Sequence, residues 1–188
     1  MLKDEHWERL RRLLLEKSYE RRRVVLTSGR ESDFYVDGKQ TSLHPEGIYL
    51  IGKLFFRQLT SGGPRVEAVG GMTLGADPLV SAVALVSHLE GAPLSAFIIR
   101  KEPKGHGTGQ WIEGKKNLTP RAPVAILEDV VTTGGTTLKA VERAEQEGLK
   151  VVRVLALVDR QEGGAEAISR AGFSLEALFV KSDLESKA

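Results

Sequence analysis

The 188-residue chain contains no cysteine, and it is poor in methionine, tryptophan and tyrosine, with 2, 2 and 3 copies. The absence of cysteine excludes disulfides, thiol nucleophiles and cysteine-based metal sites, and it fits a reducing compartment. No hydrophobic run approaches the ~20 residues that a membrane-spanning helix needs, and the charged start MLKDEHWERL is not typical of a secretion signal. The sequence therefore predicts a cytoplasmic protein without a membrane partner.

No charge of one sign dominates, since 27 Lys and Arg oppose 25 Asp and Glu for a net charge of +2. Such a balance gives no overall attraction to nucleic acid, and no recognition-helix pattern accompanies the basic run Arg21-Arg22-Arg23. We therefore expect no nucleic-acid partner and only local binding of anions. With 41% hydrophobic and 28% charged residues, the chain fits one globular domain spanning residues 1–188.

Short hydrophobic runs alternate with helical patterns from Val66 onward. We interpret runs 66–69, 94–99, 124–127, 151–158 and 173–179 as strands, with helices at 76–89, 136–147 and 164–170. This alternation predicts an α/β fold with a mainly parallel central sheet flanked by helices. Before it we expect an amphipathic helix at 4–17 with Arg9, Arg11 and Arg12 facing solvent, short strands within 24–36, and a second helix from Pro45 to about Leu59.

Polar residues and glycines gather where the predicted strands end. Ligands of α/β sheets bind beyond the carboxyl ends of the strands, so these positions are candidates for a site. The predicted ends are Gly70-Gly71-Met72-Thr73-Leu74-Gly75, Arg100-Lys101, Glu128-Asp129 and Asp159-Arg160. We expect them to form one site, in which the acidic and the basic strand ends are neighbours.

The most specific of these segments is AILEDVVTTGGTT. Glu128 and Asp129 precede the run Thr132 to Thr137, where backbone N–H groups, hydroxyls and a helix N-terminus can bind phosphate. Neither the Walker pattern nor the dinucleotide pattern is present. Acids beside a phosphate site call for a ligand that also offers hydroxyls or a cation, and a ribose 5-phosphate with Mg²⁺ meets both needs. The simpler alternative is an ordinary turn between a strand and a capped helix.

The basic strand end continues as RKEPKGHGTGQWIEG, which combines cations with glycines. The cations are Arg100, Lys101, Lys104 and His106. This composition is typical of a mobile lid that carries positive charge to an anion, and pyrophosphate suits it because charge-assisted hydrogen bonds are strong. A solvated loop is the alternative interpretation.

Together these segments resemble the type I phosphoribosyltransferases. AILEDVVTTGGTT is similar to the family's motif for phosphoribosyl pyrophosphate (PRPP). RKEPKGHGTGQWIEG, LTSGRESDFYVDGKQ and LVDRQEGG resemble segments of the branch of the family that uses orotate. The resemblance extends from about Leu26 to Gly164, and it implies the type I phosphoribosyltransferase fold with a small N-terminal hood of about residues 1–40 over the base site.

The resemblance also implies roles for the matching residues. PRPP would contact Arg100, Lys101, Lys104, His106, Glu128, Asp129, Val130, Val131, Thr132, Thr133, Gly134, Gly135 and Thr136, and orotate would contact Thr132, Arg160, Phe34 and Tyr35. The catalytic residues would be Lys101, Lys104, His106 and Asp129. Mg²⁺ would bind through PRPP, with Glu128 and Asp129 nearby, and the loop lysines would reach the neighbouring site of a homodimer.

The implied reaction transfers ribose 5-phosphate from PRPP to orotate, as in pyrimidine (UMP) biosynthesis. Two positions depart from the pattern, because Thr27 and Leu74 stand where some members of the family have lysines that contact the ligand. Two alternatives remain open. One is a phosphoribosyltransferase for another nucleobase, and the other is a regulator that keeps the fold and senses PRPP, which would need an added DNA-binding segment.

Overall fold

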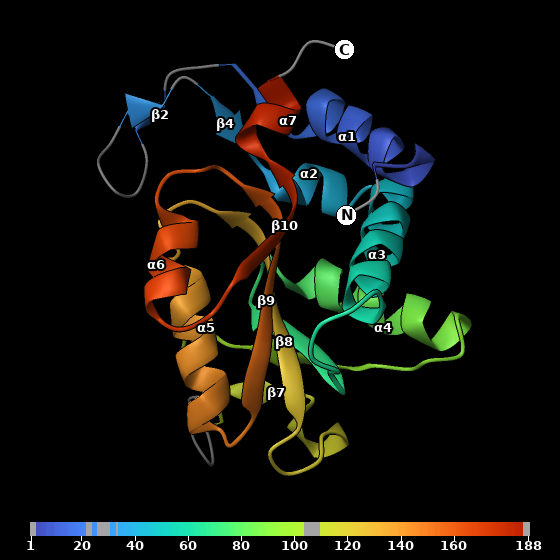
Figure 1. Ribbon diagram of the computed structural model, residues 1–188, viewed down its shortest axis with the longest axis vertical. Coiled ribbons are helices and arrows are strands. Elements are labelled where there is room, and N and C mark those ends of the chain that lie inside the picture. The colour runs from blue at the N-terminus through green and yellow to red at the C-terminus, as the bar shows by residue number, and fades with distance from the viewer. Residues whose placement is uncertain (1–2, 22–23, 26–30, 33, 104–109, 186–188) are drawn as a thin grey trace.

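The computed structural model describes residues 3–21, 24–25, 31–32, 34–103 and 110–185 (Figure 1). Thr27, Lys104 and His106 lie outside the described residues, as do Arg22 and Arg23 of the basic run. Within the described ranges, no helix combines the length and the apolar character that crossing a membrane requires.

A six-stranded sheet with the order β10-β9-β8-β5-β6-β7 forms the centre of the molecule. Its strands are β5 (Ala68–Met72), β6 (Ser95–Ile99), β7 (Ile112–Glu113), β8 (Pro123–Val131), β9 (Lys150–Asp159) and β10 (Leu175–Val180). Only β7 runs antiparallel to its neighbour among these described strands. In the sheet, β6 lies on one side of β5 and β8 lies on the other side. The strand order therefore reverses between β5 and β8. The predicted α/β fold with a mainly parallel sheet is confirmed.

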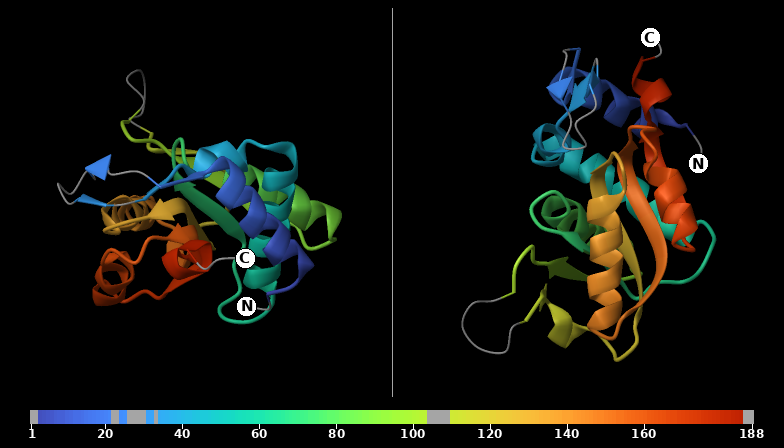
Figure 2. Two further views of the ribbon diagram at one scale, coloured as in Figure 1. Left: turned by 90° about the horizontal axis from the view of Figure 1, so that it is seen from above. Right: turned by 90° about the vertical axis from the view of Figure 1, so that its left-hand side faces the viewer.

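Helices cover both faces of this sheet (Figures 1 and 2). One face carries α3 (Pro45–Thr60) and α4 (Asp77–Leu89), and the other carries α5 (Gly135–Gln146) and α6 (Gly164–Arg170). Along β8, Ala125 and Leu127 belong to the core under α3 and α4, whereas Val124 and Ile126 belong to the core under α5 and α6. Because successive side chains are buried on opposite faces, the central strands read as continuous apolar runs in the sequence.

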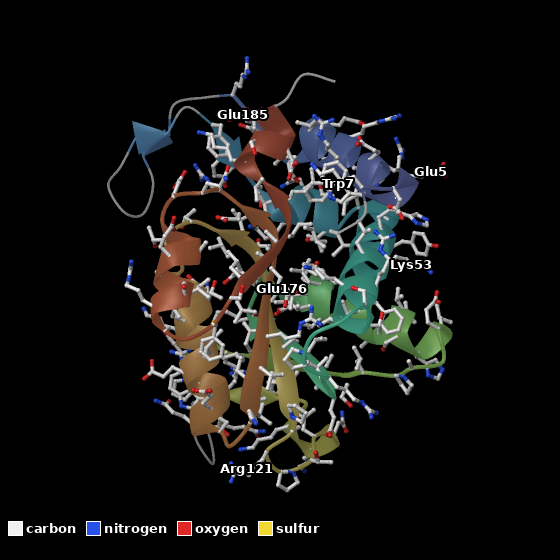
Figure 3. The ribbon with its side chains drawn as sticks, in the orientation of Figure 1. Glu5, Trp7, Lys53, Arg121, Glu176 and Glu185 are labelled. Atoms are coloured by element: carbon white, nitrogen blue, oxygen red, sulfur yellow. The ribbon has the colours of Figure 1, made fainter. Side chains whose placement is uncertain are left out.

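The N-terminal elements lie beyond the carboxyl ends of the parallel strands (Figure 1). They are α1 (Glu5–Lys17), β1 (Tyr19–Glu20), β2 (Val24–Val25), β3 (Glu31–Ser32), β4 (Tyr35–Val36) and α2 (Gly38–Ser42), with β1 paired to β4 and β2 to β3. Asp4 caps α1 by accepting a hydrogen bond of 3.1 Å from the Trp7 N–H. The Trp7 ring points inward (Figure 3), stacks on Phe179 at 4.7 Å between ring centres, and donates to the Leu178 carbonyl at 2.9 Å. These contacts attach the N-terminal segment to the last strand of the sheet.

Several short elements were not predicted, and one side chain is placed differently. The missed elements are β1, α2, β7, the 3₁₀ turn Lys115–Asn117 and α7 (Lys181–Glu185), each of five residues or fewer. Elements this short carry too little periodicity to be recognised in a sequence. Arg11, expected in solvent, is 7% exposed because its Nε donates to the Asp183 carbonyl of α7 at 2.5 Å.

Strand β5 lies further along the chain than the predicted run 66–69, so Gly70 and Gly71 are inside the strand and not in the turn after it. A Cβ atom on Gly70 would lie 2.1 Å from Cε2 of Phe97, and one on Gly71 would lie 2.3 Å from the Leu127 carbonyl oxygen. The space of both missing side chains is therefore occupied by the neighbouring strands. Glycine in a strand interior marks such a close approach.

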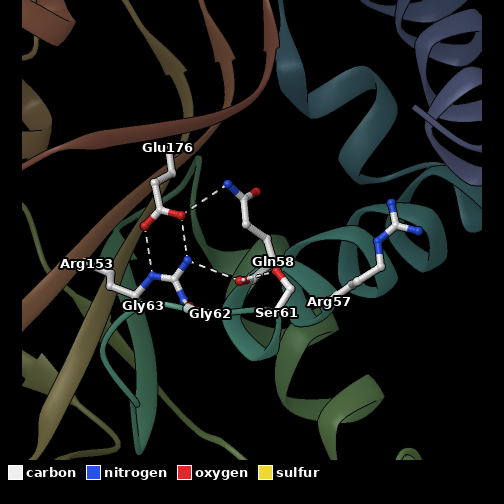
Figure 4. Close-up of a pocket in the computed structure, with 7 residues that line it drawn as sticks. All are labelled: Arg57, Gln58, Ser61, Gly62, Gly63, Arg153 and Glu176. Atoms are coloured by element: carbon white, nitrogen blue, oxygen red, sulfur yellow. Dashed lines mark hydrogen bonds and ion pairs between the residues drawn. The ribbon is translucent and has the colours of Figure 1, made fainter. Parts of the chain in front are cut away.

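A cavity of about 710 Å³ lies beside the C-terminal end of α3 and is lined by Arg57, Gln58, Ser61, Gly62, Gly63, Arg153 and Glu176 (Figure 4). The Arg153 guanidinium pairs with Glu176 through Nε at 2.8 Å and Nη2 at 2.5 Å. Its remaining N–H groups donate to the carbonyls of Gln58, Leu59 and Gly62. Because all of its donors are used within the protein, Arg153 joins the end of α3 to β9 and β10, and we assign the cavity a structural role.

Candidate active site

Three segments that are distant in the sequence converge on Asp129, near the end of β8. A Cβ atom on Gly38 would lie 3.2 Å from the Asp129 Cβ, and one on Gly75 would lie 2.6 Å from its Oδ1. The same Oδ1 accepts a hydrogen bond of 2.9 Å from the Val130 N–H. The start of α2, the turn between β5 and α4, and the end of β8 therefore meet at one carboxylate. This junction lies where the strand order reverses, the place at which open α/β sheets bind ligands.

Glu128 lies next to Asp129 in a more buried environment. Glu128 is 5% exposed, and its Oε2 accepts a hydrogen bond of 3.2 Å from the Thr137 hydroxyl. Burial, and after it the charge of Asp129, raise the pKa of Glu128 to about 8. At neutral pH Glu128 is therefore mainly a carboxylic acid, and not a carboxylate as the sequence indicated. Such a pair can both accept and donate hydrogen bonds.

The predicted phosphate site occupies the turn from β8 into α5. The helix begins at Gly135, and its N-cap Gly134 has a φ of +81°, a conformation that favours glycine. A Cβ on Gly134 would lie 3.1 Å from the Gly164 carbonyl oxygen, whereas no described atom lies within 4 Å of a Cβ on Gly135. The space in front of Gly135 is open, and the first N–H groups of a helix have no partners within that helix. An anion of the size of phosphate fits this position.

The remaining residues of this segment differ in what they can offer a ligand. Thr133 and Thr136 are exposed and Thr132 is half-buried, so their hydroxyls are accessible. Val131 is 1% exposed, and its carbonyl accepts a hydrogen bond of 2.9 Å from the Arg160 N–H. The Val130 N–H is already bonded to Asp129. The two valines therefore support the loop through packing and backbone bonds.

Lys39 brings a cation to the acidic strand end, and the sequence reasoning missed it. Its Nζ lies 2.8 Å from Asp37 Oδ1 and 3.9 Å from Asp129 Oδ2. The hydrogen bond with Asp37 raises the pKa of Lys39 above its ordinary value, so the ammonium is charged at neutral pH. The available signal was its place in the segment DGKQ, which follows the aromatic pair Phe34-Tyr35 after one valine.

The basic strand end follows β6 and is separated from the acidic end by β5, so the two are not neighbours as expected. Arg100 donates through Nη1 to Glu113 Oε1 at 3.0 Å, and Lys101 is exposed. The Arg100 N–H also donates to the Trp111 carbonyl at 2.9 Å, which closes the base of the segment 101–110. The turn after β5, residues 73–76, contains no Lys or Arg, and its most exposed side chain is Leu74, at 70%. The Thr73–Leu74 peptide bond in this turn is cis.

The last predicted strand end contacts the N-terminal elements directly. Arg160 is 3% exposed, and its Nη2 donates to the Phe34 carbonyl at 3.0 Å. The guanidinium carbon lies 4.4 Å from the centre of the Phe34 ring, and Nη2 lies 2.9 Å from Glu162 Oε1. Tyr35 is half-buried in β4. Two residues predicted for the base site from opposite ends of the chain are thus in contact.

Comparison with known proteins identifies the class. A family model described as the phosphoribosyl transferase domain matches residues 75–181, which include Gly75 and Asp129 of the junction but not Gly38, together with the predicted phosphate turn and the basic segment. The chain belongs to the phosphoribosyltransferase family, and its resemblance to the type I members is confirmed.

The similarity to individual proteins is more specific. Orotate phosphoribosyltransferase of Sorangium cellulosum is 56% identical over 176 residues, which cover 94% of this chain and 91% of the relative. Orotate phosphoribosyltransferase of Mycobacterium tuberculosis H37Rv, in complex with Fe(III) dicitrate, has a TM-score of 0.81 at 39% identity and covers 96% of this chain and 99% of its own. Its complex with PRPP has a TM-score of 0.78 at 36% identity, with the same coverage. Within its family, the chain belongs with the orotate phosphoribosyltransferases.

Proposed function

We propose that the protein transfers ribose 5-phosphate from PRPP to a ring nitrogen of orotate and releases pyrophosphate. This is a pentosyltransferase reaction of pyrimidine biosynthesis, and its product is orotidine 5′-phosphate. The observation that carries the proposal is the convergence of α2, the β5–α4 turn and β8 on Asp129, beside the open N-terminus of α5. The identity of 56% to an orotate phosphoribosyltransferase supports the choice of base.

The acidic pair and the phosphate turn suit the two ends of a ribose 5-phosphate. The 5-phosphate would lie in the open space at Gly135, with hydroxyls of Thr132, Thr133 and Thr136 as further donors. The ribose hydroxyls would contact Glu128 and Asp129. Because Glu128 is mainly protonated at neutral pH and Asp129 accepts, a vicinal diol finds one donor and one acceptor.

The cations after β6 suit the leaving group. As the bond from the anomeric carbon to pyrophosphate breaks, the ribose gains oxocarbenium character and the leaving group gains negative charge, so catalysis depends on stabilising that charge. Arg100 and Lys101 follow β6 directly, and the sequence adds Lys104 and His106. His106 or Lys101 would supply a proton to the departing oxygen. Exclusion of water from this site would protect the electrophilic carbon.

Arg160, Phe34, Tyr35 and Thr132 form our proposed orotate site. A guanidinium matches a carboxylate through two parallel hydrogen bonds, which suits the carboxylate of orotate. Arg160 is already oriented by the Phe34 carbonyl and by Glu162. The Phe34 ring is 1% exposed and packs against the Arg160 guanidinium, so it would position Arg160, and half-buried Tyr35 is the aromatic ring that could reach a pyrimidine.

The acidic pair fits a Mg²⁺ ion that is held largely by its substrate. Among the described residues, no group of three or more His, Asp or Glu side chains could hold a metal. Mg²⁺ is typically bound by one or two carboxylates together with phosphate oxygens, and Asp129 could serve as the carboxylate, with Glu128 nearby. The ion would neutralise charge on the pyrophosphate when bound.

We also propose a cytoplasmic homodimer in which the segment 101–110 reaches the partner's site. Among the residues whose burial the structure describes, five large hydrophobic side chains are at least half exposed, namely Leu43, Tyr49, Leu74, Leu85 and Leu89. They lie after α2, on α3, in the β5–α4 turn and on α4, which are successive elements beside the site. Exposed apolar side chains of this size support an interface. The absence of cysteine agrees with a reducing compartment.

Orotate consumption, followed by absorbance with and without PRPP and Mg²⁺, tests the proposed reaction. Uracil, adenine and hypoxanthine in place of orotate test the alternative of another nucleobase. DNA gel shifts without transferase activity would instead favour a PRPP-sensing regulator.

Lys101→Ala should lower kcat by orders of magnitude with a modest loss of PRPP affinity, and near-normal turnover would contradict the assignment.

Shared sites have a separate test. Homodimers of Lys101→Ala and of Asp129→Asn should each be almost inactive. If Lys101 acts in the partner's site, a mixed dimer contains one site with both residues intact. Mixing the two variants should then restore part of the activity, whereas no recovery would show that each subunit works with its own lysine.

A further inference from the structure

The phosphate turn and the basic segment are connected by one side chain of α5. We infer that Arg143 is a positioning residue for Lys101, an inference that rests on the proposed function. Arg143 Nη1 donates to the Arg100 carbonyl at 2.5 Å. Its guanidinium carbon lies 4.0 Å from the centre of the Trp111 ring. Arg143 thus contacts both ends of the segment 101–110.

The contacted ends form a paired base. Ile99 and Ile112 are partners in the β6–β7 ladder, and the next bond is the one from the Arg100 N–H to the Trp111 carbonyl at 2.9 Å. Gln110 Nε2 donates to the Ile112 carbonyl at 2.8 Å. The Arg100 carbonyl that accepts from Arg143 belongs to the same planar peptide unit as the Lys101 nitrogen. Arg143 therefore fixes the orientation of the peptide from which Lys101 extends.

The other end of α5 forms the phosphate turn. Gly135 and Arg143 lie in the same regular helix, so the distance between them along the helix axis is fixed. Binding of phosphate at Gly135 would therefore also fix where the Arg143 guanidinium meets the basic segment. A guanidinium is suited to this double contact, because it is planar and can stack on an indole while its edge donates to a carbonyl. A lysine can donate but cannot stack in the same way. Arg143 thereby holds the phosphate end and the pyrophosphate end of the site in a fixed relation.

Steady-state kinetics of three variants test this role. Arg143→Ala should lower kcat by about ten- to hundredfold and change the KM for PRPP by less than about threefold, because it misplaces a group that acts on the leaving group. Arg143→Lys should fall between this variant and the wild type. Lys139→Ala, an exposed position on the same helix, is the control and should behave as wild type. A kcat of Arg143→Ala within about twofold of wild type, or a raised KM with normal kcat, would overturn the inference.

Fluorescence gives a readout that does not need turnover. The chain has 2 tryptophans, so the difference between wild type and Trp111→Phe isolates the emission of Trp111. Addition of PRPP and Mg²⁺ without orotate should change this emission in wild type, and Arg143→Lys should abolish most of the change. An identical response in both proteins would overturn the inference, even if Arg143→Ala fails to fold.

A wild-type enzyme without orotate-dependent activity contradicts the proposed function, whereas an active wild type with unaffected Arg143 variants contradicts only this inference.

Discussion

The ammonium of Lys39 lies 3.9 Å from Oδ2 of Asp129, so a short helix before the sheet supplies a cation to the acid at the end of β8. Asp37 holds that ammonium at 2.8 Å and also caps α2 by accepting from the Lys39 N–H at 3.1 Å. Thr27 and Leu74, which stand where the resemblance predicts lysines that contact the ligand, carry no charge. Lys39 therefore provides a cation at the acidic pair, which an anionic substrate can share with Asp129.

Replacing this cation should weaken substrate binding. Lys39→Met should raise the KM for PRPP by about tenfold or more, because a charge-assisted hydrogen bond contributes roughly 1.5–3 kcal/mol. The matched control is Lys53→Met, since Lys53 pairs with Glu90 at 2.5 Å between α3 and the end of α4. Initial rates at varied PRPP concentration measure both variants. Equal KM values for Lys39→Met and the control would show that Lys39 does not contact the substrate.

The two glycines at the start of α5 should respond differently to alanine. Gly135→Ala should leave the melting temperature nearly unchanged, because its Cβ would meet no described atom within 4 Å, and yet it should raise the KM for PRPP by occupying the phosphate space. Gly134→Ala should lower stability by about 1–2 kcal/mol, because its φ is positive. Thermal unfolding and kinetics of both variants separate the two effects. Normal PRPP binding by Gly135→Ala would place the phosphate elsewhere.

Glu128 should make the stability of the free protein depend on pH. Its pKa is about 8 in the folded protein against an ordinary value of 4.5, so the folded state binds more protons between these values. The free energy of unfolding contributed by this group is therefore fully present below about pH 4.5 and is lost as the pH rises through about 8. Glu128→Gln removes the titrating group. When melting temperatures are measured at intervals of about one pH unit between pH 5 and pH 9, that of Glu128→Gln should fall less than that of wild type. Parallel curves for the two proteins would contradict this assignment.

The Arg153–Glu176 ion pair in Figure 4 should affect stability without affecting substrate binding. Arg153→Met leaves three backbone carbonyls without their donor and leaves Glu176, whose side chain is 29% exposed, with Gln58 as its remaining partner, so the loss should be about 1–3 kcal/mol. Urea unfolding measures this loss. Arg9→Met breaks the exposed pair with Glu46 and should have a much smaller effect. If Arg153→Met kept its stability but raised a KM, the cavity would have a role in substrate binding.

The sequence was sufficient where chemistry and periodicity occur in the same segment. AILEDVVTTGGTT contains an apolar strand, adjacent acids and a glycine turn, so the presence of β8 and the start of α5 were predictable, although β8 runs past the predicted end at Leu127 to Val131 and contains both acids. Lys39 and Arg143 were not, because their importance depends on which distant residues they contact. The pKa of Glu128 depends on burial under α5, which no local pattern records. The extent of β5 was misjudged because its glycines, which usually mark turns, here make room for Phe97 and Leu127.

The hydrogen bond from Arg160 to the Phe34 carbonyl has a consequence for synthesis of the chain. The N-terminal part of a protein leaves the ribosome first, so the segment around Phe34 is made long before its partner. Arg160 follows Phe34 by 126 residues. A growing chain therefore cannot complete the proposed base site until Arg160 has been added, so an N-terminal fragment that ends before this residue should not bind orotate there.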